Sequence, residues 1–223
     1  MIDSDLDLLL LLLFADNQEE IVGITRLEKL TFLLIQNKVF KKFQKDFEYE
    51  EYDYGPWSSQ ILDNVEALSS YGLILCKERS LPILEKDYYQ DEIELNFDLI
   101  KEFHENKTLV YSLSSDGIKV SKDLYSSLRE NEKQIIQSTK TKYNKMSLHE
   151  LIRYVYHFYP NFTKKSVIKD QVKKLTLTEE LRAVYPKVKI DKKLLALVGS
   201  TPELALGEEK NYFRELIREK YIE

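Results

Sequence analysis

The chain has 223 residues, which is enough for one large domain or for one domain with a helical appendage. Hydrophobic residues make up 43% of the sequence and charged residues 32%, so we expect a buried core and a well-solvated surface rather than disorder over most of the length. The single cysteine, Cys76, excludes an internal disulfide and a zinc site built from several cysteines. We expect its thiol to be a small core group.

Only the apolar run from Leu8 to Phe14 resembles a membrane or signal segment. It has about seven residues, whereas a bilayer span needs roughly 20, and acidic rather than basic residues precede it. We therefore interpret Ile2–Ala15 as a buried helix. This interpretation predicts no membrane partner and a cytoplasmic location.

The net charge of −5 hides a strong asymmetry along the chain. Residues 1–128 contain 13 basic and 25 acidic side chains, whereas residues 129–193 contain 16 basic and 7 acidic ones. A difference of this size indicates either separate binding roles or an electrostatic match between the two parts of the chain. Composition alone favours neither interpretation.

The pattern of apolar residues after the first helix predicts two more helices. Thr25 is the expected N-cap of the second helix, with Glu28 at the capping-box position. The aromatic and acidic segment Phe40–Tyr54 is expected to pack as an extended loop. Gly55-Pro56 then breaks the chain and starts a third helix, which ends near Gly72. The expected apolar stripe of this third helix consists of Ile61, Leu62, Val65 and Leu68.

The chain then changes to the period of a β-strand. Leu73–Lys77 and Thr108–Leu113 are expected to pair antiparallel, on either side of a long insertion, Leu81–Asn106. Ser114 begins a helix that runs to about Leu128. The order helix, helix, helix, strand, strand is that of a winged helix-turn-helix. The sequence therefore predicts a mainly α fold with a small antiparallel β wing in residues 1–128, the wing being enlarged by residues 81–106.

Residues 129–223 are predicted to form a helical C-terminal region, with Asn144–Met146 as the boundary between the halves. The expected helices are Glu130–Tyr143, a helix capped by Ser147 and Glu150 that ends near Tyr159, a helix from Thr163 through Lys174, the short helix Asp191–Val198 and the terminal helix 207–222. A terminal helix of this length needs a docking surface, either the core of its own chain or a second copy. We favour the second copy and expect a homodimer.

Four segments occur in an order that resembles a known family. They are Ile24–Leu30, Tyr52–Ser58, Tyr71–Ile74 and Tyr111–Gly117. From roughly residue 5 to residue 128 the chain is similar to the winged-helix proteins grouped with the YwgA-like regulators and the SocA-type (Panacea) antitoxin domain. The resemblance implies transcription regulation or toxin neutralisation, and no catalysis. Within the second segment, Trp57 is expected to be a core anchor.

A DNA-binding winged helix usually places its third helix in the major groove. The side chains of that helix that suit base edges are Ser58, Ser59, Gln60 and Asn64. Phosphate contacts need Lys or Arg, and none occurs from Tyr54 through Cys76. The insertion 81–106 contains eight acidic and two basic residues. We therefore expect neither the third helix nor the wing to hold DNA alone.

The cations lie in the basic segment 161–193 instead. The candidates for phosphate contact are Lys164, Lys165, Lys169, Lys173 and Lys174. Lys165, Lys169 and Lys173 would share one helical face. The alternative is a solvated helix or one that docks on the acidic half. The leading hypothesis is a transcriptional regulator that binds double-stranded DNA through these lysines. Its rival is an antitoxin-like or adaptor protein that recognises another protein.

The sequence contains no pattern typical of an enzyme. Its three histidines stand in unrelated contexts, with no cysteine or paired carboxylate at metal-ligand spacing. It has neither a glycine-rich phosphate loop nor Gly-x-Ser-x-Gly. We therefore expect no catalytic residues, no metal site and no cofactor; an unrecognised carboxylate site of the nuclease kind is the alternative.

Overall fold

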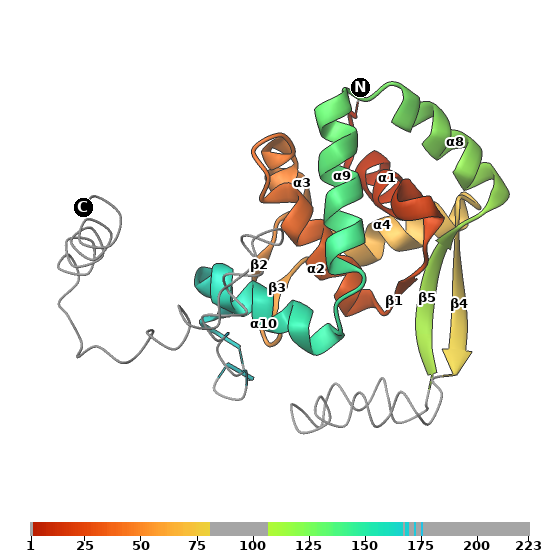
Figure 1. The fold of residues 1–223 in the computed structure, drawn as a ribbon. Coiled ribbons are helices and arrows are strands. Elements are labelled where there is room, and N and C mark those ends of the chain that lie inside the picture. Colours follow the sequence, from red (N-terminus) through yellow and green to blue (C-terminus); the bar gives the residue numbers. More distant parts are fainter. Residues whose placement is uncertain (1, 81–106, 167, 170–171, 173–174, 176–223) are drawn as a thin grey trace, which may run out of the picture. The chain divides into compact units, whose positions relative to one another are not determined.

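The computed structural model describes residues 2–80, 107–166, 168, 169, 172 and 175. Within them the chain is mainly helical, with seven α-helices and two small antiparallel sheets (Figure 1), which confirms this part of the predicted fold. The elements are, in order, α1 (Asp5–Gln18), β1 (Ile21–Val22), α2 (Ile24–Ile35), η1 (Lys41–Phe43), α3 (Gln44–Phe47), β2 (Glu50–Tyr52), β3 (Gly55–Trp57), α4 (Ser59–Ser70), β4 (Ile74–Ser80), β5 (Lys107–Leu113), α8 (Ser115–Ser126), α9 (Glu130–Tyr143), α10 (Leu148–Phe158) and η2 (Pro160–Thr163).

Helix α1 is the central element of the core. It begins after Ser4, whose Oγ accepts a hydrogen bond from the Asp7 amide while the Asp7 carboxylate accepts one from the Ser4 amide. Leu8–Leu13 are buried around the whole circumference because α4, α8, α9 and β5 all pack against this helix. The predicted buried helix is confirmed, although it starts at Asp5 and leaves helical geometry from Ala15.

The larger sheet has the strand order β1-β5-β4. β4 and β5 pair antiparallel as predicted, with Ile74 opposite Leu113. The short strand β1, which the sequence did not predict, pairs antiparallel with the other side of β5. Cys76 is exposed, because β4 is solvent-accessible from Leu75 to Ser80. The expectation that this thiol lies in the core was therefore wrong.

The charged residues of α2 are buried, which the sequence did not predict. The helix begins after Gly23, whose φ of +86° favours glycine, and no side chain caps it. The expected capping box of Thr25 and Glu28 is therefore wrong. Glu28 lies inside the protein instead, with a carboxylate oxygen 3.6 Å from Nζ of Lys29.

Two cations of α2 bind backbone carbonyls from distant parts of the chain. Arg26 Nη1 donates to the oxygens of Asn144 at 3.1 Å and Met146 at 2.6 Å. Lys29 Nζ donates to the Pro56 oxygen at 2.8 Å. Buried cations need such partners because removing them from water without replacement costs several kcal/mol. Helix α2 thus connects the turn between α9 and α10 to strand β3.

The segment Phe40–Tyr54 is not the extended loop that was expected. It contains η1, α3 and β2. Its three phenylalanines, Phe40, Phe43 and Phe47, are all buried. Their i, i+3, i+7 spacing is that of a helical face. The apolar spacing, rather than the acidic residues around it, determines the local structure here.

The helices after the sheet belong to the same compact unit as the elements before it. Helix α8 begins as predicted, with Ser114 Oγ accepting from the Gly117 amide, and Ser147 and Glu150 form the predicted capping box of α10. Helix α9 packs against α1 and α2, and α10 packs against α2. The compact unit covers Met1–Lys174 and therefore ends neither at residue 128 nor near residue 145, where boundaries were expected.

Only part of the basic segment is described. Thr163 is the last residue of η2, and its Oγ1 donates to the Pro160 oxygen, so it does not cap the helix expected there. Residues 164, 165, 168 and 169 lie in turns. The insertion 81–106, Lys173, Lys174, the short helix 191–198 and the terminal helix 207–222 lie outside the described residues, and the homodimer stays a prediction. In the described part, no helix combines the length and the apolar character that a bilayer crossing requires.

Lys140 of α9 is completely buried near the end of the regular part of α1. Its Nζ donates to the Leu13 oxygen at 2.7 Å. Burial lowers the pKa of Lys140 from 10.5 to about 8, although the carboxylates of Asp16 and Glu19 oppose this shift. The charged form of Lys140 therefore opposes folding at neutral pH.

We expect the wild-type chain to gain stability relative to Lys140→Met as the pH rises from about 8 to 10.5. In this window the unfolded chain still binds a proton that the folded chain has released, so the free energy of unfolding rises with pH, by up to about 1.4 kcal/mol per pH unit. Urea denaturation of both proteins across the window measures the difference, in which the other titrating groups cancel. A difference that does not change with pH contradicts the prediction.

Candidate interaction surface

Strands β2 and β3 form a short hairpin that ends directly before α4. Tyr52 lies opposite Gly55, so the two residues between them make the turn. Gly55 has a φ of +88°, and a Cβ at this position would lie 3.0 Å from Cε2 of Tyr156 in α10. Both the backbone conformation and the close approach of α10 therefore require glycine here.

The backbone of the hairpin is held from two sides. Lys29 of α2 binds the Pro56 oxygen, as described above. Ser166, which follows η2, donates from Oγ to the Asp53 oxygen at 2.7 Å, and the hydroxyl of Tyr156 lies 2.6 Å from the same Oγ. These contacts fix the hairpin before any partner arrives, so that binding costs little conformational entropy at this position.

The hairpin presents an aromatic pair at the surface. The ring centroids of Tyr52 and Trp57 lie 5.0 Å apart, and 46% of Tyr52 is exposed. Trp57 is partly exposed rather than the core anchor that was expected. Glu50, opposite Trp57 in the hairpin, is exposed. Tyrosine and tryptophan with accessible rings are typical anchors of protein interfaces.

Helix α4 has one buried and one exposed side. Ile61, Asn64 and Leu68 are buried. Leu62 was expected in the buried stripe, but 48% of it is exposed, because it lies on the opposite side of the helix. The exposed side, called the outer face of α4, consists of Ser59, Leu62, Asp63, Glu66, Ser69 and Ser70. It thus combines one large apolar side chain with two carboxylates and contains no cation.

The structure separates the four side chains that were expected to read base edges. Ser58 is buried, and its Oγ donates to a backbone oxygen of α3. Asn64 is also buried: its Nδ2 donates to Asp5 Oδ2 at 2.7 Å, and its Oδ1 accepts from Gln60 Nε2 at 2.9 Å. Ser59 is exposed and Gln60 is partly exposed. In this conformation Ser58 and Asn64 join α4 to α3 and α1 and do not face a ligand.

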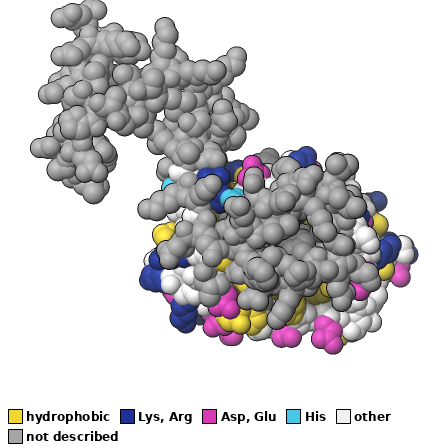
Figure 2. Space-filling view, turned by 90° about the horizontal axis from the view of Figure 1, so that it is seen from below, with side chains coloured by type: hydrophobic (Ala, Val, Ile, Leu, Met, Phe, Trp, Pro, Cys, Tyr) yellow, Lys and Arg dark blue, Asp and Glu magenta, His cyan; other side chains and the backbone are white. Residues whose placement is uncertain are grey.

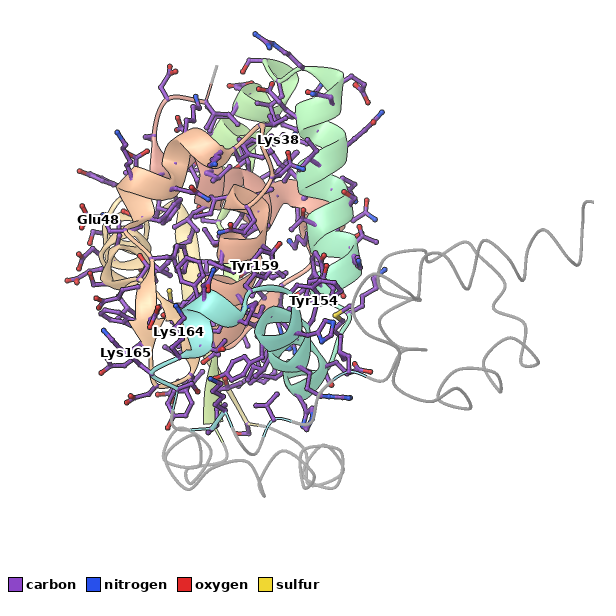
Figure 3. The ribbon with its side chains drawn as sticks, turned by 90° about the vertical axis from the view of Figure 1, so that its left-hand side faces the viewer. Lys38, Glu48, Tyr154, Tyr159, Lys164 and Lys165 are labelled. Carbon is purple, nitrogen blue, oxygen red and sulfur yellow. The ribbon has the colours of Figure 1, made fainter. Side chains whose placement is uncertain are left out.

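Three of the five candidate phosphate-binding lysines are described. Lys164, Lys165 and Lys169 are all exposed, in turns rather than on the helical face that was expected. Ser166 directly follows Lys164 and Lys165 in the chain, and its hydrogen bond to the Asp53 oxygen places these two lysines near the hairpin. Figure 3 labels Lys164 and Lys165 in the left half of its view.

One face of the described part of the chain is chemically mixed. On the face drawn in Figure 2, hydrophobic, acidic and basic side chains of the described residues lie among one another. Groups of three or more His, Cys, Asp or Glu side chains that could hold a metal ion do not occur in the part of the chain that the structure describes. The aromatic pair and the outer face of α4 come from consecutive elements, β2, β3 and α4, and together form the candidate interaction surface.

Sequence reasoning missed Tyr52 as a surface residue. Treating Phe40–Tyr54 as a loop hid the alternation by which Glu50 and Tyr52 fall on one side of a strand. Trp57, opposite Glu50, lies on that same side of the hairpin. The signal that could have found the pair is Gly55, which predicts a tight turn between two strands.

Comparison of the chain with protein-family models, with curated proteins and with solved structures found no match.

Proposed function

We propose that this chain is a winged-helix protein that recognises another protein through its β2–β3 hairpin and the outer face of α4. The order α1, β1, α2, α4, β4, β5 supports the winged-helix assignment, because it brings three helices together with a three-stranded sheet of order β1-β5-β4. The resemblance to the SocA-type antitoxin group supports a role in protein recognition. The observation that carries the proposal is the composition of the outer face of α4.

That face is poorly suited to DNA. Asp63 and Glu66 would approach phosphates in the usual docking mode, and no Lys or Arg occurs from Tyr54 through Cys76 to offset them. Juxtaposed like charges cost several kcal/mol in an interface. Two of the four expected base readers are also buried. Helix α4 therefore lacks the phosphate contacts that hold a recognition helix in the groove.

The same features suit a protein partner. Tyr52 and Trp57 offer aromatic anchors of the kind on which binding energy concentrates, and Leu62 adds an exposed apolar contact. The carboxylates of Asp63 and Glu66 select a partner with a basic surface, since complementary charge steers association. The proposed partner is therefore a protein with a basic surface and an apolar contact, as an antitoxin-like or adaptor function requires.

We expect Leu62→Arg to weaken binding to this partner about 30-fold, or by about 2 kcal/mol, because it removes an apolar contact and places a cation against a basic surface. A photo-reactive amino acid at position 62 identifies the partner by cross-linking in cells, and calorimetry with the purified partner measures the affinity. Val120→Arg is the matched control, because Val120 is a similarly exposed apolar residue on α8. Equal affinities of wild type and Leu62→Arg would refute the proposal.

Binding of nucleic acid through the lysines after η2 is the second candidate, favoured by the exposure of Lys164, Lys165 and Lys169. A duplex of random sequence tests it by mobility shift. We expect this candidate to be supported over the first if the protein binds the duplex at physiological salt and two further results hold. Changing these three lysines to glutamine should abolish the binding, and Leu62→Arg should leave it unchanged.

A further inference from the structure

The chain from Lys133 of α9 to the turns after η2 is rich in cations that the proposed protein interface does not use. Residues 133–169 contain eight Lys or Arg and one acidic residue, Glu150. One cation, Lys140, is buried, and the other seven are exposed or partly exposed. The single carboxylate is engaged at the start of α10, where Glu150 Oε2 accepts from the Ser147 amide at 2.9 Å. A stretch with this composition attracts polyanions.

Four partly exposed rings form a continuous chain of contacts within this stretch. They are Tyr143, Tyr154, Phe158 and His157, called the ring ladder below. The successive centroid distances are 5.0, 4.5 and 4.8 Å. The first ring belongs to the last residue of α9 and the other three to α10. Tyr143 and Tyr154 also pack against the buried cluster of Phe32, Leu33, Leu151 and Val155, so each shows only part of its surface to solvent. Figure 3 marks Tyr154 on this helix.

One cation, Lys142, lies directly on the ring ladder. Lys142 Nζ lies 4.9 Å from the ring centroid of Tyr143 and 5.2 Å from that of Tyr154. Arg153 is partly exposed on α10, immediately before Tyr154 and one helical turn before His157. Partly exposed aromatic rings and cations therefore lie close together on α9 and α10.

We infer that the ring ladder and its cations bind single-stranded nucleic acid. Rings stack on unpaired bases while cations contact the phosphates, and proteins use this combination to bind single strands without sequence preference. A duplex can use the cations but not the rings, because its bases stack on one another. The surface is separate from the hairpin and the outer face of α4, so the inference does not depend on the proposed function.

Fluorescence anisotropy with a labelled oligothymidylate and a duplex of the same length tests the inference on the full chain. We expect the single strand to bind more tightly than the duplex. Tyr154→Ala is expected to weaken this binding about 5- to 100-fold, because one stacked base is lost, whereas Tyr154→Phe keeps the ring and the affinity. An oligonucleotide that contains 2-aminopurine reports stacking on the wild-type protein by quenching of its fluorescence.

The cations provide an independent readout. Changing Lys142 and Arg153 together to glutamine is expected to lower the slope of log affinity against log salt by about 1.4, since each contact to a single strand contributes about 0.7. Lys119→Gln, which removes an exposed charge on α8, is the control and should leave the slope unchanged. The salt dependence of Lys142→Gln, Arg153→Gln tests the inference even if Tyr154→Ala disturbs the fold.

Several results would overturn the inference. They are absence of oligonucleotide binding at low salt, tighter binding of the duplex, an unchanged affinity in Tyr154→Ala, or binding of phosphatidylserine vesicles in place of the oligonucleotide. Leu62→Arg should bind the oligonucleotide like wild type, so failure here and failure of the proposed protein interface are distinguishable.

Discussion

Replacing Gly117 by alanine is expected to lower the free energy of unfolding by about 3 kcal/mol or more. Gly117 lies in the first turn of α8, where a Cβ would meet the Leu73 oxygen at 1.9 Å. That oxygen is fixed, because it accepts a hydrogen bond from the Ser114 amide at 3.0 Å and belongs to the residue before β4. The substitution therefore forces α8 away from the sheet. Urea denaturation followed by circular dichroism measures the loss.

Gly72→Ala is a matched control that separates backbone conformation from steric clash. Gly72 has a φ of +69°, but a Cβ there would meet nothing within 4 Å. Its expected cost is only the roughly 1–2 kcal/mol of a left-handed residue with a side chain. If Gly117→Ala costs no more than Gly72→Ala, then α8 and the start of β4 do not approach as closely as described above.

Replacing Lys29 by methionine is expected to destabilise the chain by about 3–5 kcal/mol, as is typical when one member of a buried ion pair is removed. The Lys29 side chain is 1% exposed and interacts with both Glu28 and the Pro56 oxygen. Methionine has a similar length, but it neither balances the carboxylate nor donates to the carbonyl. Urea denaturation measures the loss, and hydrogen exchange should show faster opening of the hairpin.

The double variant Glu28→Gln, Lys29→Met tests the cause of this loss. It also removes the buried negative charge that Lys29 balances in the wild type, so we expect it to be more stable than Lys29→Met alone. Lys119→Met, at an exposed position of α8, is the control and should change stability by less than about 0.5 kcal/mol. A Lys29→Met protein as stable as wild type would show that the buried pair contributes nothing net.

The helix caps that the sequence predicted correctly depend on neighbours along the chain. The capping box of α10 joins Ser147 to Glu150, three residues away, and Ser114 caps α8 through the amide of Gly117. Such contacts lie within one helical turn, so the residue types at fixed spacing identify them. The pairing of β4 with β5 was predictable from the change of apolar period, even with a long insertion between the strands.

The features that the sequence did not predict depend on remote partners. Arg26 and Lys29 resemble solvated charges of an amphipathic helix, but their acceptor carbonyls lie 118, 120 and 27 residues away. Asn64 resembles a base-reading side chain, and its partner Asp5 lies 59 residues away. Residue type does not reveal which remote carbonyl or carboxylate will meet a polar side chain. The segment Tyr52–Ser58 was recognisable in the sequence as a motif, but its exposure was not. The exposure of Trp57 follows from the register of the β2–β3 hairpin, which the sequence did not predict.

The long sequence separation between α1 and α2 and their hydrogen-bond partners has a consequence for the synthesis of the protein. The leucines of α1 and the guanidinium group of Arg26 leave the ribosome early, whereas Lys140 and Met146, which complete their surroundings, are added more than 100 residues later. At about 5–20 residues per second, the nascent chain exposes an unfinished apolar helix for roughly 5–25 seconds. We expect chaperones to hold this leucine-rich helix during that interval and to release it once α9 has emerged.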